Sequence, residues 1–289
     1  MYNMLDQLPR IQHIALHQTI QKIASIANAE KIFCYGYRIT QLNQWSPFRI
    51  NPSDKPINDY AYDLLLVLPD SNTANEDSTQ ELLRNHLDAF SGFSFVIFRR
   101  DETIIRLERE DHFICTVLNK ARLLYNNDTP PFTAEKVCSN PAAFKKYTAL
   151  WWQQWFSLAG QSLLAAYRAA GEYDNRQALY QLYHSTIRTC MGLVNAYTGL
   201  RPSRRSLCRL MAYCDNFCSI RTDVFPNNTA EEKRLLQSLV KAGEAKDKPY
   251  PITKQTVDTL LQRVGLLHEM AEKLYGNTDS KKIKTIPYA

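Results

Sequence analysis

Strand-like segments occur only within the first 126 residues of this chain, and this change of pattern limits the folds that it can adopt. Before that point, short apolar runs alternate with longer amphipathic segments, which predicts a sheet with helices packed on it. After residue 133 only helix-length patterns follow, joined by short polar connections, which predicts an antiparallel helical bundle. The sequence therefore predicts an α+β protein with two domains.

A turn-rich stretch, Asn126-Asn-Asp-Thr-Pro-Pro131, separates the two patterns. A chain of 289 residues is also long for a single domain. We expect a mixed-sheet domain over residues 1–128, a helical domain over 132–278 and a tail over 279–289.

The predicted strands are short apolar runs bounded by Gly, Pro or polar residues, and the predicted helices repeat apolar residues three or four positions apart. The first strand is expected to end in a turn at Gly36. In the first half we expect helices at 5–29, 80–91 and 103–119, strands at 31–36, 62–69, 93–98 and 121–125, and a long loop at 38–60. In the second half we expect helices at 141–171, 175–199, 203–220, 229–243 and 253–275.

The net charge of +6 is unevenly distributed along the chain. Residues 1–130 hold 13 Lys and Arg against 16 acids, a net of −3, whereas residues 131–289 hold 22 against 13, a net of +9. The basic half is expected to meet an anionic partner or to pack against the acidic half. A basic solvated surface without a ligand is an equally good interpretation.

Cysteine usage and the absence of long apolar runs indicate a cytoplasmic protein without membrane association. The seven cysteines are scattered without a disulfide framework, which suits a reducing compartment. The first residues lack the basic start and apolar core of a signal peptide. No apolar run approaches the roughly 20 residues that a membrane helix requires.

The strand–Gly–loop–strand pattern that contains Gly36-Tyr37-Arg38 and Asp63 resembles the minimal nucleotidyltransferase domain, over about residues 5–127. In that family the first strand ends in Gly-Ser, which holds the triphosphate, and the second strand carries two acids one residue apart. A third acid comes from a later strand. Here Tyr37 stands at the Ser position, Ala61 stands at the first acid, and the strand at 93–98 offers no acid.

Asp63 is thus the one acid of the pattern that remains, and two-metal phosphoryl transfer requires clustered carboxylates. We expect a structural role for Asp63 and no cofactor, with Mg²⁺ needed only if transferase activity survived. A weak nucleotide or phosphate pocket at Gly36, Tyr37 and Arg38 is the functional alternative.

Two segments of the second half, Leu179-Tyr-Gln-Leu-Tyr-His-Ser185 and Tyr197-Thr-Gly-Leu-Arg-Pro-Ser-Arg-Arg-Ser-Leu207, resemble HEPN domains. Many HEPN domains cut RNA with an Arg that is followed, a few residues later, by a His. Arg201 stands at the position of that Arg, but Arg205 replaces the His, and a guanidinium does not accept a proton near neutral pH. His184 is the other catalytic candidate, although a role on the helix surface or in the core is favoured. The resemblance implies a homodimer and a relation to toxin–antitoxin systems.

The strongest functional signal is a group of arginines around the junction of two predicted helices. Arginines in a first helical turn oppose the helix dipole, at a cost of roughly 0.3–1 kcal/mol each, so a partner is expected. That partner is either RNA or nucleotide phosphate or the acidic first domain. The predicted anion-binding residues are Arg188, Arg201, Arg204, Arg205 and Arg209.

Two further patterns are expected to be structural. Cys214 and Cys218 lie one helical turn apart, but Cys208 is off their face, so we expect small buried side chains and no metal site. The aromatic-rich helix with Trp151 and Trp155 is expected to form a core or interdomain face rather than a base-stacking platform.

The sequence therefore predicts a catalytically degenerate nucleotidyltransferase–HEPN protein that acts as a binding or regulatory module. One alternative is an enzyme, either an RNase that uses Arg201 and Arg205 with His184 or a weak transferase that uses Asp63. The other alternative is a purely structural interaction protein.

Overall fold

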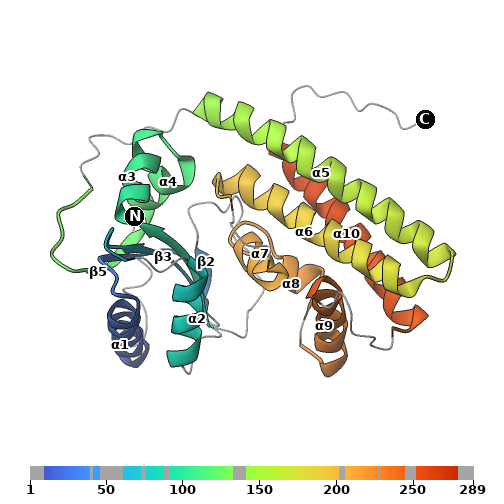
Figure 1. The fold of residues 1–289 in the computed structure, drawn as a ribbon, viewed down its shortest axis with the longest axis horizontal. Helices are drawn as coiled ribbons and strands as arrows, with labels where there is room; N and C mark the ends of the chain where they lie inside the picture. The colour runs from blue at the N-terminus through green and yellow to red at the C-terminus, as the bar shows by residue number, and fades with distance from the viewer. Residues whose placement is uncertain are drawn as a thin grey trace. The chain divides into compact units, whose positions relative to one another are not determined.

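The structure is a computed structural model that describes residues 10–39, 42–45, 61–72, 76–87, 92–132, 141–201, 206–226, 228–244 and 252–278. The chain divides into two compact units, Met1–Asn140 and Pro141–Ala289. The first combines a mixed sheet with helices, and the second is helical in its described part (Figure 1). Within the described ranges, no helix is long and apolar enough to cross a membrane.

A mixed sheet forms the centre of the first unit. Its strands lie in the order β2-β1-β3-β4, and β5 also pairs with β1. β1 is antiparallel to β2, β3 and β5, whereas β3 and β4 are parallel. The strands are β1 (Lys31–Ile39), β2 (Leu42–Trp45), β3 (Ala61–Leu68), β4 (Phe93–Arg99) and β5 (Arg122–Asn126).

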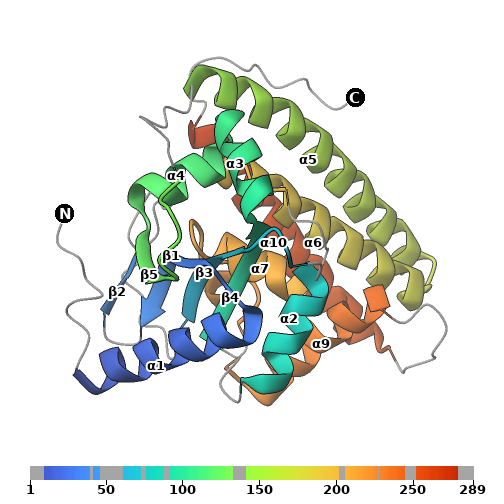
Figure 2. The same cartoon turned by 60° about the vertical axis from the view of Figure 1, so that its left-hand side comes forward.

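Helices cover both faces of this sheet (Figure 2). Alternate residues of β3, such as Leu64 and Leu66, join Ile20 and Ile23 of α1 and Leu83 of α2 in one core. The ring of Phe113 on α4 packs on the other face, where its centroid lies 5.3 Å from that of Tyr35 on β1. The helices of this unit are α1 (Arg10–Ala27), α2 (Glu76–His86), α3 (Arg100–Glu108) and α4 (His112–Lys120).

The first strand does not end at Gly36, as the sequence had predicted. β1 continues to Ile39, with Gly36 opposite Asp63 on β3 and with an irregular register between Cys34 and Gly36. β2 lies within the segment predicted to be a loop. Pairing with neighbouring strands holds this polar segment extended, and such pairing depends on context more than on local composition.

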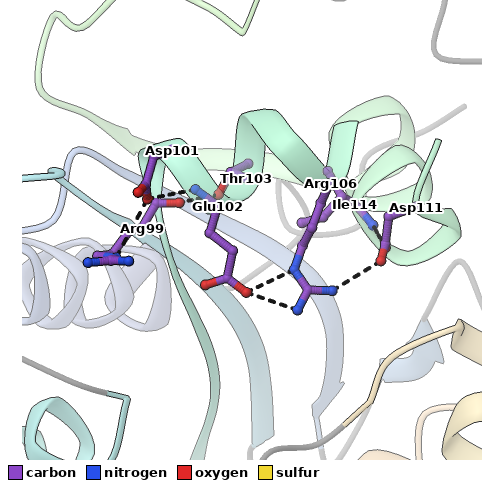
Figure 3. Close-up of polar contacts among 7 residues, drawn as sticks. All are labelled: Arg99, Asp101, Glu102, Thr103, Arg106, Asp111 and Ile114. Carbon is purple, nitrogen blue, oxygen red and sulfur yellow. Dashed lines mark hydrogen bonds and ion pairs between the residues drawn. The ribbon is translucent and has the colours of Figure 1, made fainter. Parts of the chain in front are cut away.

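The single helix predicted at 103–119 is instead two helices, α3 and α4. Glu110 adopts a positive φ of 53° between them, which ends the first helix. Asp111 then caps the second helix, where its Oδ1 accepts a hydrogen bond from the backbone N of Ile114 at 3.1 Å. Arg106 connects the two, since its guanidinium lies 2.9 Å from Glu102 Oε1 and 3.1 Å from Asp111 Oδ2 (Figure 3).

The segment predicted to link the domains, 126–131, is attached to the first unit. Lys31 is buried and donates from Nζ to the carbonyl oxygen of Thr129 at 2.9 Å. Arg100 and Lys31 both lie over the ring of Phe132, at 5.3 and 5.9 Å from its centroid. The first unit therefore includes residues that the sequence assigned to the linker.

The second unit is built around α6, which packs against α5, α7, α9 and α10. Four of the predicted helices are confirmed, and the fifth, at 203–220, is wrong. In that region α7 is only eight residues long and is followed by a turn and the four-residue α8. The helices are α5 (Pro141–Gly171), α6 (Asn175–Thr198), α7 (Leu207–Cys214), α8 (Ile220–Asp223), α9 (Ala230–Glu244) and α10 (Lys254–Thr278).

The long helix α5 is antiparallel to both α6 and α10. Its first turns lie beside the end of α6, where Gly199 closes the helix in the left-handed conformation. Tyr197 of α6 donates to the carbonyl oxygen of Leu274 near the end of α10 at 2.8 Å. One end of the bundle therefore combines the start of α5 with the ends of α6 and α10 (Figure 1).

Candidate functional site

The nucleotidyltransferase-like residues lie in the interior of the first unit. Asp63 is fully buried, with 0% of its surface exposed, and Tyr37 packs into the core beside α1 at 3%. Burial raises the pKa of Tyr37 to about 12. Gly36 lies within β1 between these residues, and the side chain of Arg38 is outside the described residues. Gly36, Tyr37 and Asp63 therefore form no open phosphate-binding turn.

Two neighbours of Asp63 were not found from the sequence. Burial, followed by the negative charge of Asp63, raises the pKa of the Cys34 thiol to about 12. Arg122 acts on the same thiol in the opposite direction, from β5 on the other side of β1. Asp63 and Arg122 are 59 positions apart in the sequence. Only the pairing of β3 and β5 with β1 relates them, so no local sequence pattern could have predicted it.

His184 and Arg201, the two catalytic candidates of the HEPN-like half, are not brought together. His184 lies on α6, where its ring makes edge contacts with Tyr180 at 4.4 Å and Tyr183 at 5.4 Å. Fourteen residues of helix separate it from Thr198, a distance of about 21 Å at 1.5 Å per residue. Arg201 follows that end of the helix, so the proposed catalytic pair has no common site in this structure.

Arg188 on α6 forms hydrogen bonds with residues of α5. Its Nη1 donates to the carbonyl oxygen of Leu158 on α5 at 3.1 Å and to Ser162 Oγ. Leu158 lies seven residues, or about 10 Å, along α5 from Trp151, which contacts Arg201. The structure therefore separates Arg188 from Arg201.

Besides Arg188 and Arg201, the structure describes only Arg209 of the predicted cluster. Arg209 on α7 donates from Nε to the hydroxyl of Tyr213 at 2.6 Å, and its guanidinium lies 5.3 Å from the centroid of that ring. Arg204 and Arg205 are outside the described residues. The described arginines thus do not converge on one groove.

Among the described arginines of the group, Arg201 is the exposed one, and its guanidinium contacts two aromatic rings. Its Cζ lies 4.4 Å from the ring centroid of Trp151 and 4.8 Å from that of Tyr147, both on the first turns of α5. It makes no hydrogen bond or ion pair with any residue that the structure describes. A stacked guanidinium keeps its N–H donors in the plane of the group, where they can bind a carboxylate or phosphate.

The segment of the chain that contains Arg201 is basic. Neither α5 nor α6 contains an Asp or Glu. Residues 141–214 carry nine Lys and Arg against two acids, a net of +7 that exceeds the +6 of the whole chain. Those acids, Glu172 and Asp174, lie beyond the far end of α5, at least 31 Å along the helix from Trp151, which is several Debye lengths at physiological salt.

Other charged residues occur at the same end of the bundle. Lys145 and Lys146 are exposed in the helical turn before Tyr147. α10 contributes Glu269, Glu272 and Lys273 in its last turns. Within the described residues neither glutamate forms an ion pair with Arg201, so its charge remains available to an external anion.

The aromatic residues of α5 divide between two sides of the helix. Trp152 stacks on Tyr275 of α10 at 4.6 Å, as a core residue would. Trp151 stacks instead on Trp155 at 6.1 Å, with 26° between the ring planes, and it also contacts Arg201. The spacing of 147, 151 and 155 is the sequence signal for this second row, which the prediction of one apolar face did not distinguish from the first.

The cysteines of the second unit are mostly internal. Cys190, Cys214 and Cys218 are buried, whereas Cys208 is exposed, so the expectation of a buried side chain is wrong for Cys208. Burial raises the pKa of the Cys214 thiol well above its usual range. Among the residues that the structure describes, no group of three or more His, Cys, Asp or Glu could hold a metal ion.

No protein-family model matches this chain, and a comparison with curated proteins finds no similar sequence.

Proposed function

We propose that this protein binds RNA without cutting it, and that the end of the helical unit around Arg201 contacts the phosphate backbone. The observation that carries the proposal is the exposed guanidinium of Arg201, which lies over Trp151 and Tyr147 and has no acceptor among the described residues. A binding or regulatory role, related to toxin–antitoxin systems, is the function that the HEPN-like motifs favour.

Geometry and charge support a phosphate ligand. A guanidinium matches two phosphate oxygens with two parallel N–H bonds, and such charge-assisted bonds are stronger than neutral ones. The net charge of +7 over residues 141–214 adds a field that attracts polyanions. An RNA backbone presents the repeated phosphates that such a field favours.

The positions of the candidate bases support binding without cleavage. Attack by a 2′-hydroxyl requires a proton acceptor within hydrogen-bond reach. His184 belongs to a part of α6 about 21 Å from the helix end that precedes Arg201. Arg205, at the position of the family's His, is a guanidinium and does not accept a proton near neutral pH.

The first unit is proposed to be non-catalytic for a related reason. Two-metal phosphoryl transfer needs carboxylates that reach the substrate. Asp63 is fully buried and Tyr37 occupies the core beside α1, which supports a structural role for both. We propose that this unit contributes stability or a regulatory contact rather than nucleotide chemistry.

The test is a titration of fluorescently labelled RNA with the full chain over a series of salt concentrations. We expect Arg201→Ala to weaken binding and to reduce the log–log salt slope by about 0.7–0.9, the contribution of one phosphate contact. Arg168→Ala is a matched control, because Arg168 is also exposed but lies about 25 Å further along α5 than Trp151. Equal slopes for wild type and Arg201→Ala, or RNA cleavage that His184→Ala abolishes, would contradict the proposal.

A further inference from the structure

The guanidinium of Arg201 contacts two aromatic rings and belongs to an exposed side chain. Its Cζ lies 4.4 Å from the centroid of Trp151 and 4.8 Å from that of Tyr147, and both distances are within the range of a cation–π contact. The side chain is nevertheless exposed, so part of it can be reached by a ligand. A planar group that contacts aromatic rings and is exposed offers a surface on which another planar group can stack.

The support beneath Arg201 is a continuous row of rings. Trp151 lies over Trp155 with 6.1 Å between centroids, and Tyr147 flanks Trp151 at 6.3 Å. Trp155 packs tightly against α6, where a Cβ at Gly192 would lie only 3.3 Å from the Trp155 Cβ. Two tryptophans one turn apart on the same helix, backed by a second helix, leave Arg201 little freedom to tilt.

We infer that an unpaired base of single-stranded RNA stacks on the outer face of Arg201, so that the row continues as base, Arg201, Trp151 and Trp155. This inference rests on the proposed function and names its ligand class. Unpaired bases stack on aromatic rings and on arginine planes, and every base offers such a face. The in-plane donors of Arg201 remain directed at phosphate, so one side chain contacts both the base and the backbone.

This arrangement distinguishes single strands from two other polyanions. In an RNA duplex the bases stack on one another and present no free face, so a duplex meets only the charge of Arg201 and its neighbours. Inorganic polyphosphate has the charge but no bases. The exposed Lys145 and Lys146, one to two helical turns before Trp151, attract all three ligands alike.

The experiment compares single-stranded RNA, the duplex of the same sequence and inorganic polyphosphate as ligands of the full chain. Three substitutions are used: Arg201→Ala, Arg201→Lys, which keeps the charge but not the plane, and Lys254→Ala. The last is a matched control, because Lys254 also lies over an exposed ring, Tyr173 at 5.8 Å, on the opposite end of the bundle.

We expect wild type to prefer the single strand by roughly 5- to 150-fold, the range that one base stack supplies. Arg201→Lys should lose that preference while its salt slope stays unchanged. Arg201→Ala should lose the preference and also show a reduced salt slope, and Lys254→Ala should resemble wild type. If wild type binds all three ligands equally and Arg201→Ala weakens all three, the stacking inference is wrong and the proposed RNA contact remains. If wild type binds none of them, the proposed function is wrong as well.

Discussion

Replacement of Arg188 by Met tests whether Arg188 stabilises the packing of the helices while Arg201 binds the ligand. In the sequence Arg188 and Arg201 belong to one basic group. In the structure Arg188 donates to the Leu158 carbonyl and to Ser162 Oγ, between α5 and α6. Met keeps the unbranched apolar stem of Arg but lacks the guanidinium, so it removes the charge and the donors.

The cost follows from these contacts. A hydrogen bond to a charged group contributes roughly 1.5–3 kcal/mol. We take that range for the pair together, because a helical carbonyl such as that of Leu158 keeps its backbone partner and the Ser162 hydroxyl can turn to another acceptor. For a unit of this size, 1 kcal/mol corresponds to roughly 2–4 °C, so the unfolding temperature should fall by about 3–12 °C.

Thermal unfolding followed by circular dichroism, beside the RNA titration at several salt concentrations, gives both readouts. We expect Arg188→Met to lower the unfolding temperature and to leave the salt slope unchanged. Arg201→Ala should reduce the salt slope and leave the unfolding temperature unchanged. A reduced salt slope with normal stability for Arg188→Met would refute the assignment of Arg188 to the helix interface.

Two further predictions concern the packing of the helical unit. Gly243→Ala should lower stability by about 1–2 kcal/mol, because its Cβ would lie 1.9 Å from Tyr183 Cζ and overpacking outweighs the gain in helix propensity. Gly171→Ala is the control, because its Cβ would meet nothing within 4 Å, and it should not be destabilising. Urea titration measures the stability of both variants, and a larger loss of stability for Gly171→Ala than for Gly243→Ala would contradict this prediction. His268 stacks on Phe156 at 4.0 Å, and burial lowers its pKa, so the unfolded chain takes up its proton more readily and stability should fall as pH drops below about 6.5. His268→Phe should reduce that pH dependence in unfolding curves between pH 7 and 5, and an unchanged dependence would count against it.

Long amphipathic repeats made most of the helices predictable. α5, α6, α9 and α10 each extend over several turns, so their apolar periodicity exceeds the noise of local composition. Short helices, and helices whose ends are set by a capping residue, were harder to predict from the sequence. The break between α3 and α4 depends on Asp111 and its contact with Arg106, and α7 ends after eight residues.

The candidate site was harder to predict than the fold. Closeness in sequence suggested that Arg188 and Arg201 act together, but ten residues of helix, about 15 Å, extend from Arg188 to the end of α6 that precedes Arg201. The aromatic residues of α5 were recognised as one apolar face. Only the packing of α5 against α6 and α10 distinguishes Trp152, in the core, from Trp151, beside Arg201.

The sequence by itself determined the change from sheet to helices and the absence of carboxylates from α5 and α6, because periodicity and composition are local properties of the chain. Only the tertiary structure decided that Arg201 meets Trp151, fifty residues earlier. The antiparallel packing of α5 on α6 brings the start of one helix to the end of the other. Which side chains meet there depends on which faces the helices bury, and that is set by the packing of the whole unit.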